Sequence, residues 1–387
     1  MYNINMKGGF KNMDLNYLRN EIDKIDSEIL SIFEKRMDLC RQVAVYKKEN
    51  NLPIFQGNRE NQIIEKIRNK APEQLRDGST ALFLSIMDIS KSLQQYEIYK
   101  NIPFPEYKAL DTETARNIIC QGVEGSNSEE AAKKLFGSSK DIKFCSDFND
   151  VFRAVEDGTA DFGILPILNS TAGSVTHTYD LMKKHNFYIV SSVSIEICHC
   201  LAAKKNTRFE DITAVYSHPH ALSQCSEFLK SGSFKTVSYA NTAMSALYAK
   251  ESNEPVAAIC SEKCAELYGL EIIKKNIADS KPNYTKFICI SKEFFRENDA
   301  DTISVMLKLP HKTGSLYRLL TKFFVSGLNL KRIESRPIPD GSFDVVFYLD
   351  FEGNVDDINV SSLIMEMNDT VDDFRFLGNF HEHKTID

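Results

Sequence analysis

Apolar residues between Leu15 and Tyr46 recur at alternating spacings of four and three, the pattern of a long helix that packs along a partner. Pro and Gly interrupt the helical pattern at 50–58 and 71–79, so residues 14–100 predict three helices. The first would be about 50 Å long at ~1.5 Å per residue. Two shorter helices cannot cover its apolar row, so we expect a dimer. The row consists of Leu18, Ile22, Ile25, Ile29, Ile32, Leu39, Val43 and Tyr46.

Arg36 occupies one position of this apolar row. A guanidinium stays charged and is costly to desolvate alone, so we expect a carboxylate of the protein or an anionic ligand beside it. Lys47, eleven residues later, shares its helix face, whereas Arg19 points away and is better placed to reach a neighbouring chain. Periodicity alone favours a structural pairing of Arg36 with a Glu.

Residues 101–116 contain two prolines and no clear period, which indicates a linker or a docking arm. Residues 117–292 then alternate short apolar strands with helices in two consecutive series. This rhythm predicts parallel α/β sheets in two lobes with a cleft between them, like a periplasmic binding protein. Polar residues follow several strands, and we place them at strand carboxyl ends, where open α/β sheets bind ligands. They are Ser126, Asn169, Thr171, Ser217, Gln224, Thr285 and Lys286.

Three features of this region have ordinary structural explanations. Ser128 is expected to cap a helix, and His218, followed by a proline at a helix start, is a capping or packing residue. In the run Cys198, His199, Cys200, the histidine side chain points away from both thiols on a strand, so no metal site is assigned. We expect no cofactor.

Residues 302–387 follow the order β, α, β, β, α, β, which predicts a ferredoxin-like α+β domain. The composition fits a globular protein with two or three domains. A formal net charge of −7 argues against nucleic-acid and membrane partners. Nine scattered cysteines, with no apolar leader or membrane-spanning run, indicate a cytoplasmic location.

The helical segment resembles the all-helical chorismate mutases, which are intertwined dimers. The resemblance rests on Arg19, Arg36, Lys47, Arg59, Glu60, Ser90 and Gln94, taken in order and spacing. It implies that Arg36 and the partner chain's Arg19 clamp the carboxylates of chorismate. Lys47 and Gln94 would donate to the ether oxygen, and Glu60 would hold the ring hydroxyl. Gln56 stands where family members carry Asp.

Residues 117–292 resemble prephenate dehydratase. The resemblance implies that Thr285 donates a hydrogen bond to the departing hydroxyl, while Asn169, Ser217 and Gln224 orient prephenate and Ser126 and Thr171 line the cleft. The sequence departs from the family in two places. Leu168 replaces a Glu, and Lys286 replaces an Arg, which turns a bidentate carboxylate clamp into a point contact.

The segments HKTGSLYRLL and IESRP resemble the regulatory ACT domain of dehydratases, which binds phenylalanine between paired subunits. The resemblance implies an effector site built from Gly314, Ser315, Leu316, Glu334, Ser335 and Arg336, with Ser315 where Ala is usual. Together the segments resemble the bifunctional chorismate mutase/prephenate dehydratases, as a homodimer or homotetramer inhibited by phenylalanine. A binding module with an impaired dehydratase and an arogenate dehydratase remain alternatives.

Overall fold

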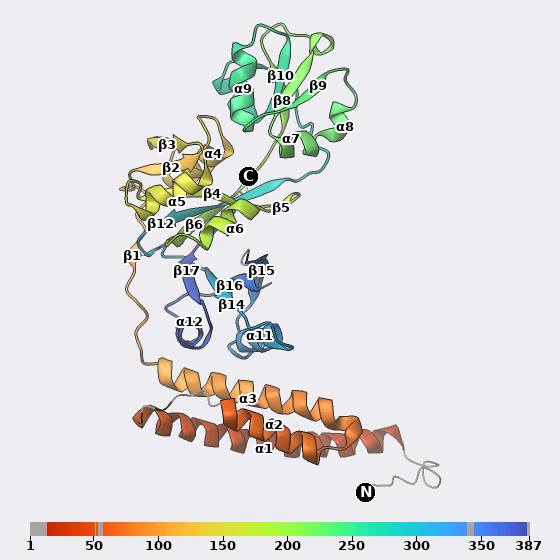
Figure 1. The fold of residues 1–387 in the computed structure, drawn as a ribbon, viewed down its shortest axis with the longest axis vertical. Coiled ribbons are helices and arrows are strands. Elements are labelled where there is room, and N and C mark those ends of the chain that lie inside the picture. The colour runs from red at the N-terminus through yellow and green to blue at the C-terminus, as the bar shows by residue number, and fades with distance from the viewer. Residues whose placement is uncertain (1–13, 51, 53–56, 339–343, 385–387) are drawn as a thin grey trace. The chain divides into compact units, whose positions relative to one another are not determined.

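The computed structural model describes residues 14–50, 52, 57–338 and 344–384. The chain forms two compact units (Figure 1). One contains the chain up to Pro103 together with 312–327 and 358–369, and the other contains 104–311, 328–357 and the residues from Thr370 onward. The C-terminal region therefore contributes helices to the first unit and strands to the second.

The first unit begins with the expected long helix. Helix α1 (Leu15–Glu49) starts after Asp14, whose side chain accepts a hydrogen bond from the backbone N–H of Asn16. Helices α2 (Gly57–Lys70) and α3 (Arg76–Tyr99) follow, with a short 3-10 turn at Glu73–Leu75 between them. Helix α3 lies along α1 (Figure 1). In the single chain the eight residues of the predicted apolar row are 37–66% exposed.

Two later helices complete the first unit: α11 (Ser315–Val325) and α12 (Ile358–Thr370). The hydroxyls of Ser85 on α3 and Tyr317 on α11 lie 3.0 Å apart. Tyr99 at the end of α3 donates a hydrogen bond to Asp369 on α12. These contacts attach both late helices to α3.

The second unit contains two large sheets. Seven strands form the first sheet in the order β18-β6-β12-β4-β2-β3, with β5 paired to β4, and five form the second in the order β11-β7-β10-β8-β9. Both are mixed, because β12 runs antiparallel to β4 and β6, and β7 runs antiparallel to β10 and β11. The expectation of parallel sheets was wrong for β7 and β12. The chain crosses from one sheet to the other just before each of these two strands. The strand bounds are β2 Ile118–Gln121, β3 Ile142–Cys145, β4 Phe162–Asn169, β5 Gly173–Ser174, β6 Tyr188–Glu196, β7 Cys200–Ala203, β8 Ala214–Ser217, β9 Lys235–Ser238, β10 Val256–Cys260, β11 Glu271–Lys274, β12 Tyr284–Ser291 and β18 Glu382–Lys384.

Helices cover each sheet and supply the apolar cores between helix and strand. Next to the first sheet they are α4 (Asn127–Phe136), α5 (Phe148–Glu156) and α6 (Thr176–Met182). Next to the second are a 3-10 turn (Phe209–Asp211), α7 (Pro219–Gln224), α8 (Ser226–Leu229), α9 (Thr242–Glu251) and α10 (Glu262–Leu267). Separate clusters of buried side chains lie beside the two sheets, so each lobe has its own core.

A four-stranded antiparallel sheet closes the second unit. Its strands β14 (Thr302–Lys308), β15 (Leu330–Pro337), β16 (Val345–Glu352) and β17 (Arg375–Phe380) take the order β15-β16-β14-β17. The segment predicted as a docking arm contains β1 (Lys108–Ala109), which pairs with β13 (Phe295–Arg296). Within the described residues, no helix is long and apolar enough to cross a membrane.

Candidate active sites

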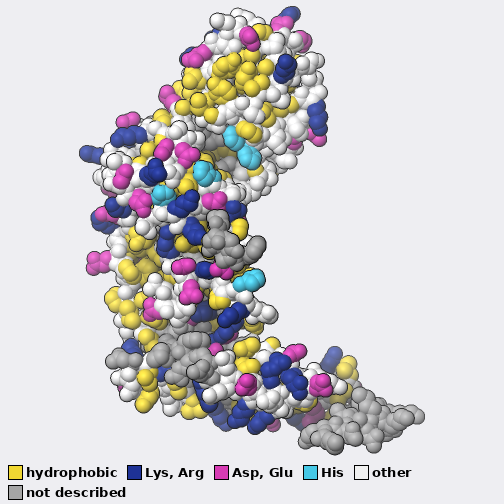
Figure 2. All heavy atoms as spheres, in the orientation of Figure 1, with side chains coloured by type: hydrophobic (Ala, Val, Ile, Leu, Met, Phe, Trp, Pro, Cys, Tyr) yellow, Lys and Arg dark blue, Asp and Glu magenta, His cyan; other side chains and the backbone are white. Residues whose placement is uncertain are grey.

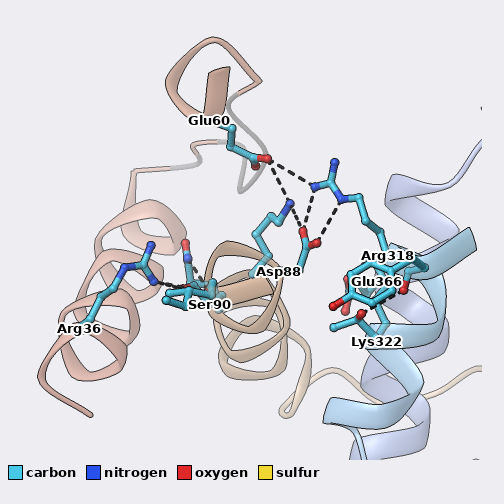
Figure 3. Close-up of polar contacts among 12 residues, drawn as sticks. Arg36, Glu60, Asp88, Ser90, Arg318, Lys322 and Glu366 are labelled. Carbon is cyan, nitrogen blue, oxygen red and sulfur yellow. Dashed lines mark hydrogen bonds and ion pairs between the residues drawn. The ribbon is translucent and has the colours of Figure 1, made fainter. Parts of the chain in front are cut away.

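The first candidate site lies among α1, α2 and α3. Arg36, half-buried on α1, donates hydrogen bonds to the Ser90 hydroxyl and to the backbone carbonyl of Ile86, both on α3 (Figure 3). No carboxylate of the described residues pairs with it. The structural Glu partner favoured by periodicity alone is therefore absent from this part of the chain.

Three more of the predicted residues lie on the same three helices, Lys47 on α1, Glu60 on α2 and Gln94 on α3. Gln94, buried one turn after Ser90, donates its amide to the Ser90 carbonyl at 3.2 Å. Burial lowers the pKa of Lys47, and the charge of Glu60 opposes this change. The Glu60 carboxylate accepts from Lys91 of α3 at 3.2 Å. The Arg36 guanidinium and the Gln94 amide thus meet at Ser90, where a carboxylate could be held.

The other mutase residues do not join this cluster in the single chain. Arg19 and Arg59 are exposed, and Arg19 lies 17 residues before Arg36, which is about 25 Å along a helix axis. Gln56 lies outside the described residues.

The second candidate site is a cavity of about 620 Å³ lined from both large sheets. Helices α4 and α9 begin at its wall, where Ser126 and Asn241 cap them by accepting backbone N–H groups. Helix starts attract anions. No Lys, Arg, Asp or Glu is among the described residues that line the cavity, so hydrogen-bonding side chains, histidines and helix starts are the groups there that could recognise a charged ligand.

Thr285 and Asn169 face this cavity from neighbouring strands β12 and β4. The Asn169 amide donates to the Thr285 hydroxyl oxygen at 2.9 Å, and its own carbonyl oxygen accepts from the backbone N–H groups of Thr171 and Ala172. These bonds fix which way the amide points. Because the Thr285 oxygen already accepts, its hydrogen is available to a ligand.

Gln224 and Thr171 extend the same network from the second lobe to the first. The Gln224 amide donates to the Thr171 hydroxyl at 2.7 Å. Thr171 is exposed and is not among the residues that line the cavity. It supports Gln224 and Asn169 rather than facing the ligand.

Sequence reasoning missed two members of this network. Asn283, almost fully buried, accepts from Asn169 at 2.8 Å and donates to the Gln224 carbonyl oxygen at 3.2 Å. His199 contacts that same oxygen at 3.0 Å and lines the cavity. Burial lowers the pKa of His199. Asn283 lies two residues before Thr285 in the sequence, and this closeness was the signal that could have identified it.

Several histidines line the cavity, and the sequence pattern did not predict that they would gather there. His177, His199, His218 and His220 line it, and histidine side chains gather on this part of the surface in Figure 2. His218 caps α7 by accepting from the His220 backbone N–H, as predicted, and burial lowers its pKa. Ser126, not Ser128, caps α4, because the helix begins two residues earlier than expected.

Three predicted positions point away from the cavity. Ser217 is fully buried and donates to the Ile259 carbonyl at 2.8 Å. Lys286 follows Thr285 on β12, so its side chain takes the opposite face of the strand and pairs with Glu382 at 2.6 Å. Leu168 opposes Lys286 across the ladder and packs on an apolar core. Thr285 and Lys286 also lie at the start of a strand, not in a loop after one.

The predicted effector residues fall into two groups, each in its own unit. Gly314 has a positive φ of 86° and open space around it, and Ser315 starts α11. On β15, Ser335 is exposed, while Glu334 accepts from the Ser174 hydroxyl at 2.7 Å and Arg336 donates to Asp180. Ser174 itself lines the dehydratase-like cavity.

The chain matches two family models, chorismate mutase type II over residues 18–95 and prephenate dehydratase over residues 118–294. It is 31% identical over 370 residues to a bifunctional chorismate mutase/prephenate dehydratase of Aquifex aeolicus, across 95% of this chain and 98% of that one. The chain belongs to the bifunctional chorismate mutase/prephenate dehydratase family. Chorismate mutase and prephenate dehydratase are the activities of this family.

Two further relatives each match about two thirds of this chain. An arogenate dehydratase/prephenate dehydratase of Arabidopsis thaliana is 35% identical, across 70% of this chain and 74% of that one. The crystal structure of prephenate dehydratase from Arthrobacter aurescens in complex with L-Phe is 28% identical, with a TM-score of 0.63, across 68% of this chain and 89% of that one. The mutase cluster and the two-lobed cavity lie within the segments that the two family models match.

Proposed function

We propose that this chain rearranges chorismate to prephenate in the cluster around Arg36 and converts prephenate to phenylpyruvate in the two-lobed cavity. Two sets of hydrogen-bonded residues carry the proposal. Arg36, Ser90 and Gln94 meet in the mutase segment. Asn169, Gln224 and Thr285 meet in the dehydratase segment. The two sets use different chemistry, charge in the first and neutral hydrogen bonds in the second.

The mutase reaction is a rearrangement that needs no acid, base or nucleophile. The protein needs only to hold the compact conformer of chorismate and stabilise charge that grows on the ether oxygen. Arg36 and the partner chain's Arg19 bind the carboxylates, and Lys47 and Gln94 donate to the ether oxygen. Glu60 accepts from the ring hydroxyl, and Ser90 holds Arg36 in place. Gln56 and Arg59 complete the substrate contacts.

The dehydratase reaction removes the ring hydroxyl as water and a ring carboxylate as carbon dioxide. Thr285 donates a hydrogen bond to the leaving hydroxyl, and its effect grows in a low-dielectric cavity. The lack of Lys and Arg among the described lining residues suits decarboxylation, because a permanent cation would stabilise the carboxylate that must leave. Asn169 and Gln224 orient prephenate, and the starts of α4 and α9 attract its anionic groups.

The C-terminal region, residues 302–387, is proposed as an ACT domain that binds phenylalanine. Its four-stranded order with a helix after the first and third strands fits a ferredoxin-like fold. The left-handed conformation and open surroundings of Gly314 leave the start of α11 accessible to an amino acid's carboxylate. The remaining proposed segments are a mutase domain at 14–100, a linker at 101–116 and a dehydratase domain at 117–292.

A homodimer, or a tetramer built from it, is proposed from the apolar row of α1. Eight large apolar side chains that are 37–66% exposed in one chain form a continuous stripe that monomeric proteins rarely leave open. A second α1 packed on this stripe would also supply Arg19. The cytoplasm is the proposed location because all nine cysteines are free thiols.

Arogenate is the main alternative substrate, and the Arabidopsis relative gives it weight. Arogenate carries an ammonium where prephenate carries a neutral ketone. No Asp or Glu is among the described residues that line the cavity, so a buried ammonium would lack a charged partner. We therefore favour prephenate. A binding module with an impaired dehydratase is less favoured, because Leu168 and Lys286 do not line the cavity.

Side-by-side assays of chorismate, prephenate and arogenate, each with and without phenylalanine, test this function. We expect turnover of chorismate and prephenate, little turnover of arogenate, and inhibition by phenylalanine. Arg36→Ala should abolish mutase turnover and leave turnover of supplied prephenate intact. Binding of prephenate without formation of phenylpyruvate would overturn the dehydratase proposal.

A further inference from the structure

A cluster of four charged side chains joins α11 to the proposed mutase site. Arg318 of α11 makes a bidentate ion pair with Asp88 of α3, at 2.8 and 3.1 Å (Figure 3). The same guanidinium lies 3.4 Å from Glu60 of α2. Lys91 contacts Asp88 at 2.7 Å and Glu60 at 3.2 Å. Each carboxylate is therefore bound by both cations.

Burial makes this cluster interdependent. The Asp88 side chain is 6% exposed and that of Glu60 is 18% exposed, so each needs a cation to offset its loss of hydration. Removing Arg318 would leave both carboxylates with one cation fewer, and Lys91 would still contact both of them. Lys91 would then be drawn between them, and the position of Glu60 would be less fixed.

The cluster holds Glu60 through one oxygen. Lys91 and Arg318 both contact Oε2 of Glu60. An ionised carboxylate has about four acceptor positions, so two charge-assisted bonds at one oxygen fix the group and leave it able to accept from a ligand. The bidentate ion pair with Asp88 in turn fixes the orientation of the Arg318 guanidinium.

We propose that Arg318 is a positioning residue of the chorismate mutase site, supplied by the C-terminal region, which holds Glu60 for the substrate's ring hydroxyl. This inference rests on the proposed mutase function. Arg318 follows Ser315 by three residues, about one helical turn from the proposed effector site. An effector that moves the start of α11 would also move Arg318. Phenylalanine would then change mutase activity by changing how Arg318 holds Glu60.

Arg318→Gln in the full-length chain is the primary test. We expect kcat/KM for chorismate to fall roughly tenfold, the size typical of hydrogen bonds to charged groups, while turnover of prephenate stays unchanged. Mutase inhibition by phenylalanine should be lost, and dehydratase inhibition should remain. Arg318→Lys keeps the charge but loses the fork, so it should recover part of the activity. It also serves as the second variant if Arg318→Gln does not fold.

Tyr317→Phe is the matched control. It removes the hydrogen bond between Ser85 of α3 and Tyr317 of α11, without touching the charge cluster. We expect mutase activity within about twofold of wild type, since exposed neutral bonds contribute little. An equal loss in Tyr317→Phe and Arg318→Gln would mean that helix docking alone matters, and would overturn the proposal.

A double variant separates positioning from general structure. If Arg318 acts through Glu60, Glu60→Gln/Arg318→Gln should be no less active than Glu60→Gln alone. A chorismate analogue without the ring hydroxyl should lose little when Arg318 is replaced. Additive losses, or unchanged mutase kinetics in Arg318→Gln, would overturn the proposal. A wild-type chain with no mutase activity would instead refute the proposed function.

Discussion

Thr285 and Lys286 are consecutive residues of β12 whose side chains have separate partners on opposite faces of the strand. The Thr285 hydroxyl accepts from Asn169 at 2.9 Å in the cavity, and the Lys286 ammonium pairs with Glu382 of β18 at 2.6 Å. The face of β12 that carries Thr285 therefore belongs to the dehydratase site. The side chain of Lys286, on the other face, links β12 to β18 through its ion pair with Glu382.

Thr285→Val tests the role of the hydroxyl with little change in volume. The variant cannot donate to the leaving hydroxyl, so kcat for prephenate should fall about 10²-fold or more. KM should change far less, because the bond strengthens mainly in the transition state. Steady-state assays of phenylpyruvate formation measure both constants. Turnover close to wild type would remove Thr285 from the mechanism.

Lys286→Met tests the opposite face of the same strand. The carboxylate clamp implied by family resemblance predicts a large rise in KM for prephenate, whereas the observed pairing with Glu382 predicts a change within about threefold. The main effect should be a lower thermal unfolding temperature, because Glu382 is left partly buried without its cation. Glu382→Gln in the Lys286→Met background should restore part of that loss. A tenfold rise in KM would support the clamp instead.

His199 should make stability depend on pH. Burial lowers its pKa below the ordinary value of 6.5, although the bond to Gln224 opposes this. The unfolded chain then takes up a proton before the folded chain does. The contribution to stability is complete above pH 6.5 and is lost as the pH falls through the lower folded pKa.

His199→Gln provides the comparison, measured by thermal unfolding between pH 7.5 and about pH 5. The wild type should lose more stability than the variant over this interval. Dehydratase activity should fall over the same interval, because a protonated His199 would place a cation at the cavity wall, where it would stabilise the carboxylate that must leave. Parallel unfolding profiles for the two proteins would show that His199 does not carry this dependence.

The spacing of apolar residues and the positions of Pro and Gly were sufficient to predict the helical segment and the order of the C-terminal elements. The apolar spacing from Leu18 to Tyr46 predicted α1, and the Pro and Gly interruptions separated α2 and α3 correctly. Such signals are local, so a single sequence reports them directly. The two lobes were predicted for the same reason, from two series of short strands and helices.

Long-range contacts were beyond the reach of the sequence pattern. The strand β12 was interpreted as a loop around Thr285, and only its pairing with β4 and β6 shows that Lys286 faces away from the cavity. Ser217 looked like a cleft residue because it ends a strand, but its hydroxyl donates to Ile259. The pairing of Arg318 with Asp88 joins residues 230 positions apart, which no local motif encodes.

The central proposal is that each mutase site combines Arg36 of one chain with Arg19 of a partner. Arg19→Ala and Arg36→Ala, co-expressed with different tags and purified as a mixed dimer, test it directly. One site of the mixed dimer should then contain both native arginines and the other neither.

We expect each variant alone to be nearly inactive as a mutase, and the mixed dimer to regain about half of wild-type activity, since one of its two symmetry-related sites is intact. Dehydratase activity on prephenate should be equal in all samples and reports the amount of folded protein. A mixed dimer no more active than its two parents would contradict the claim.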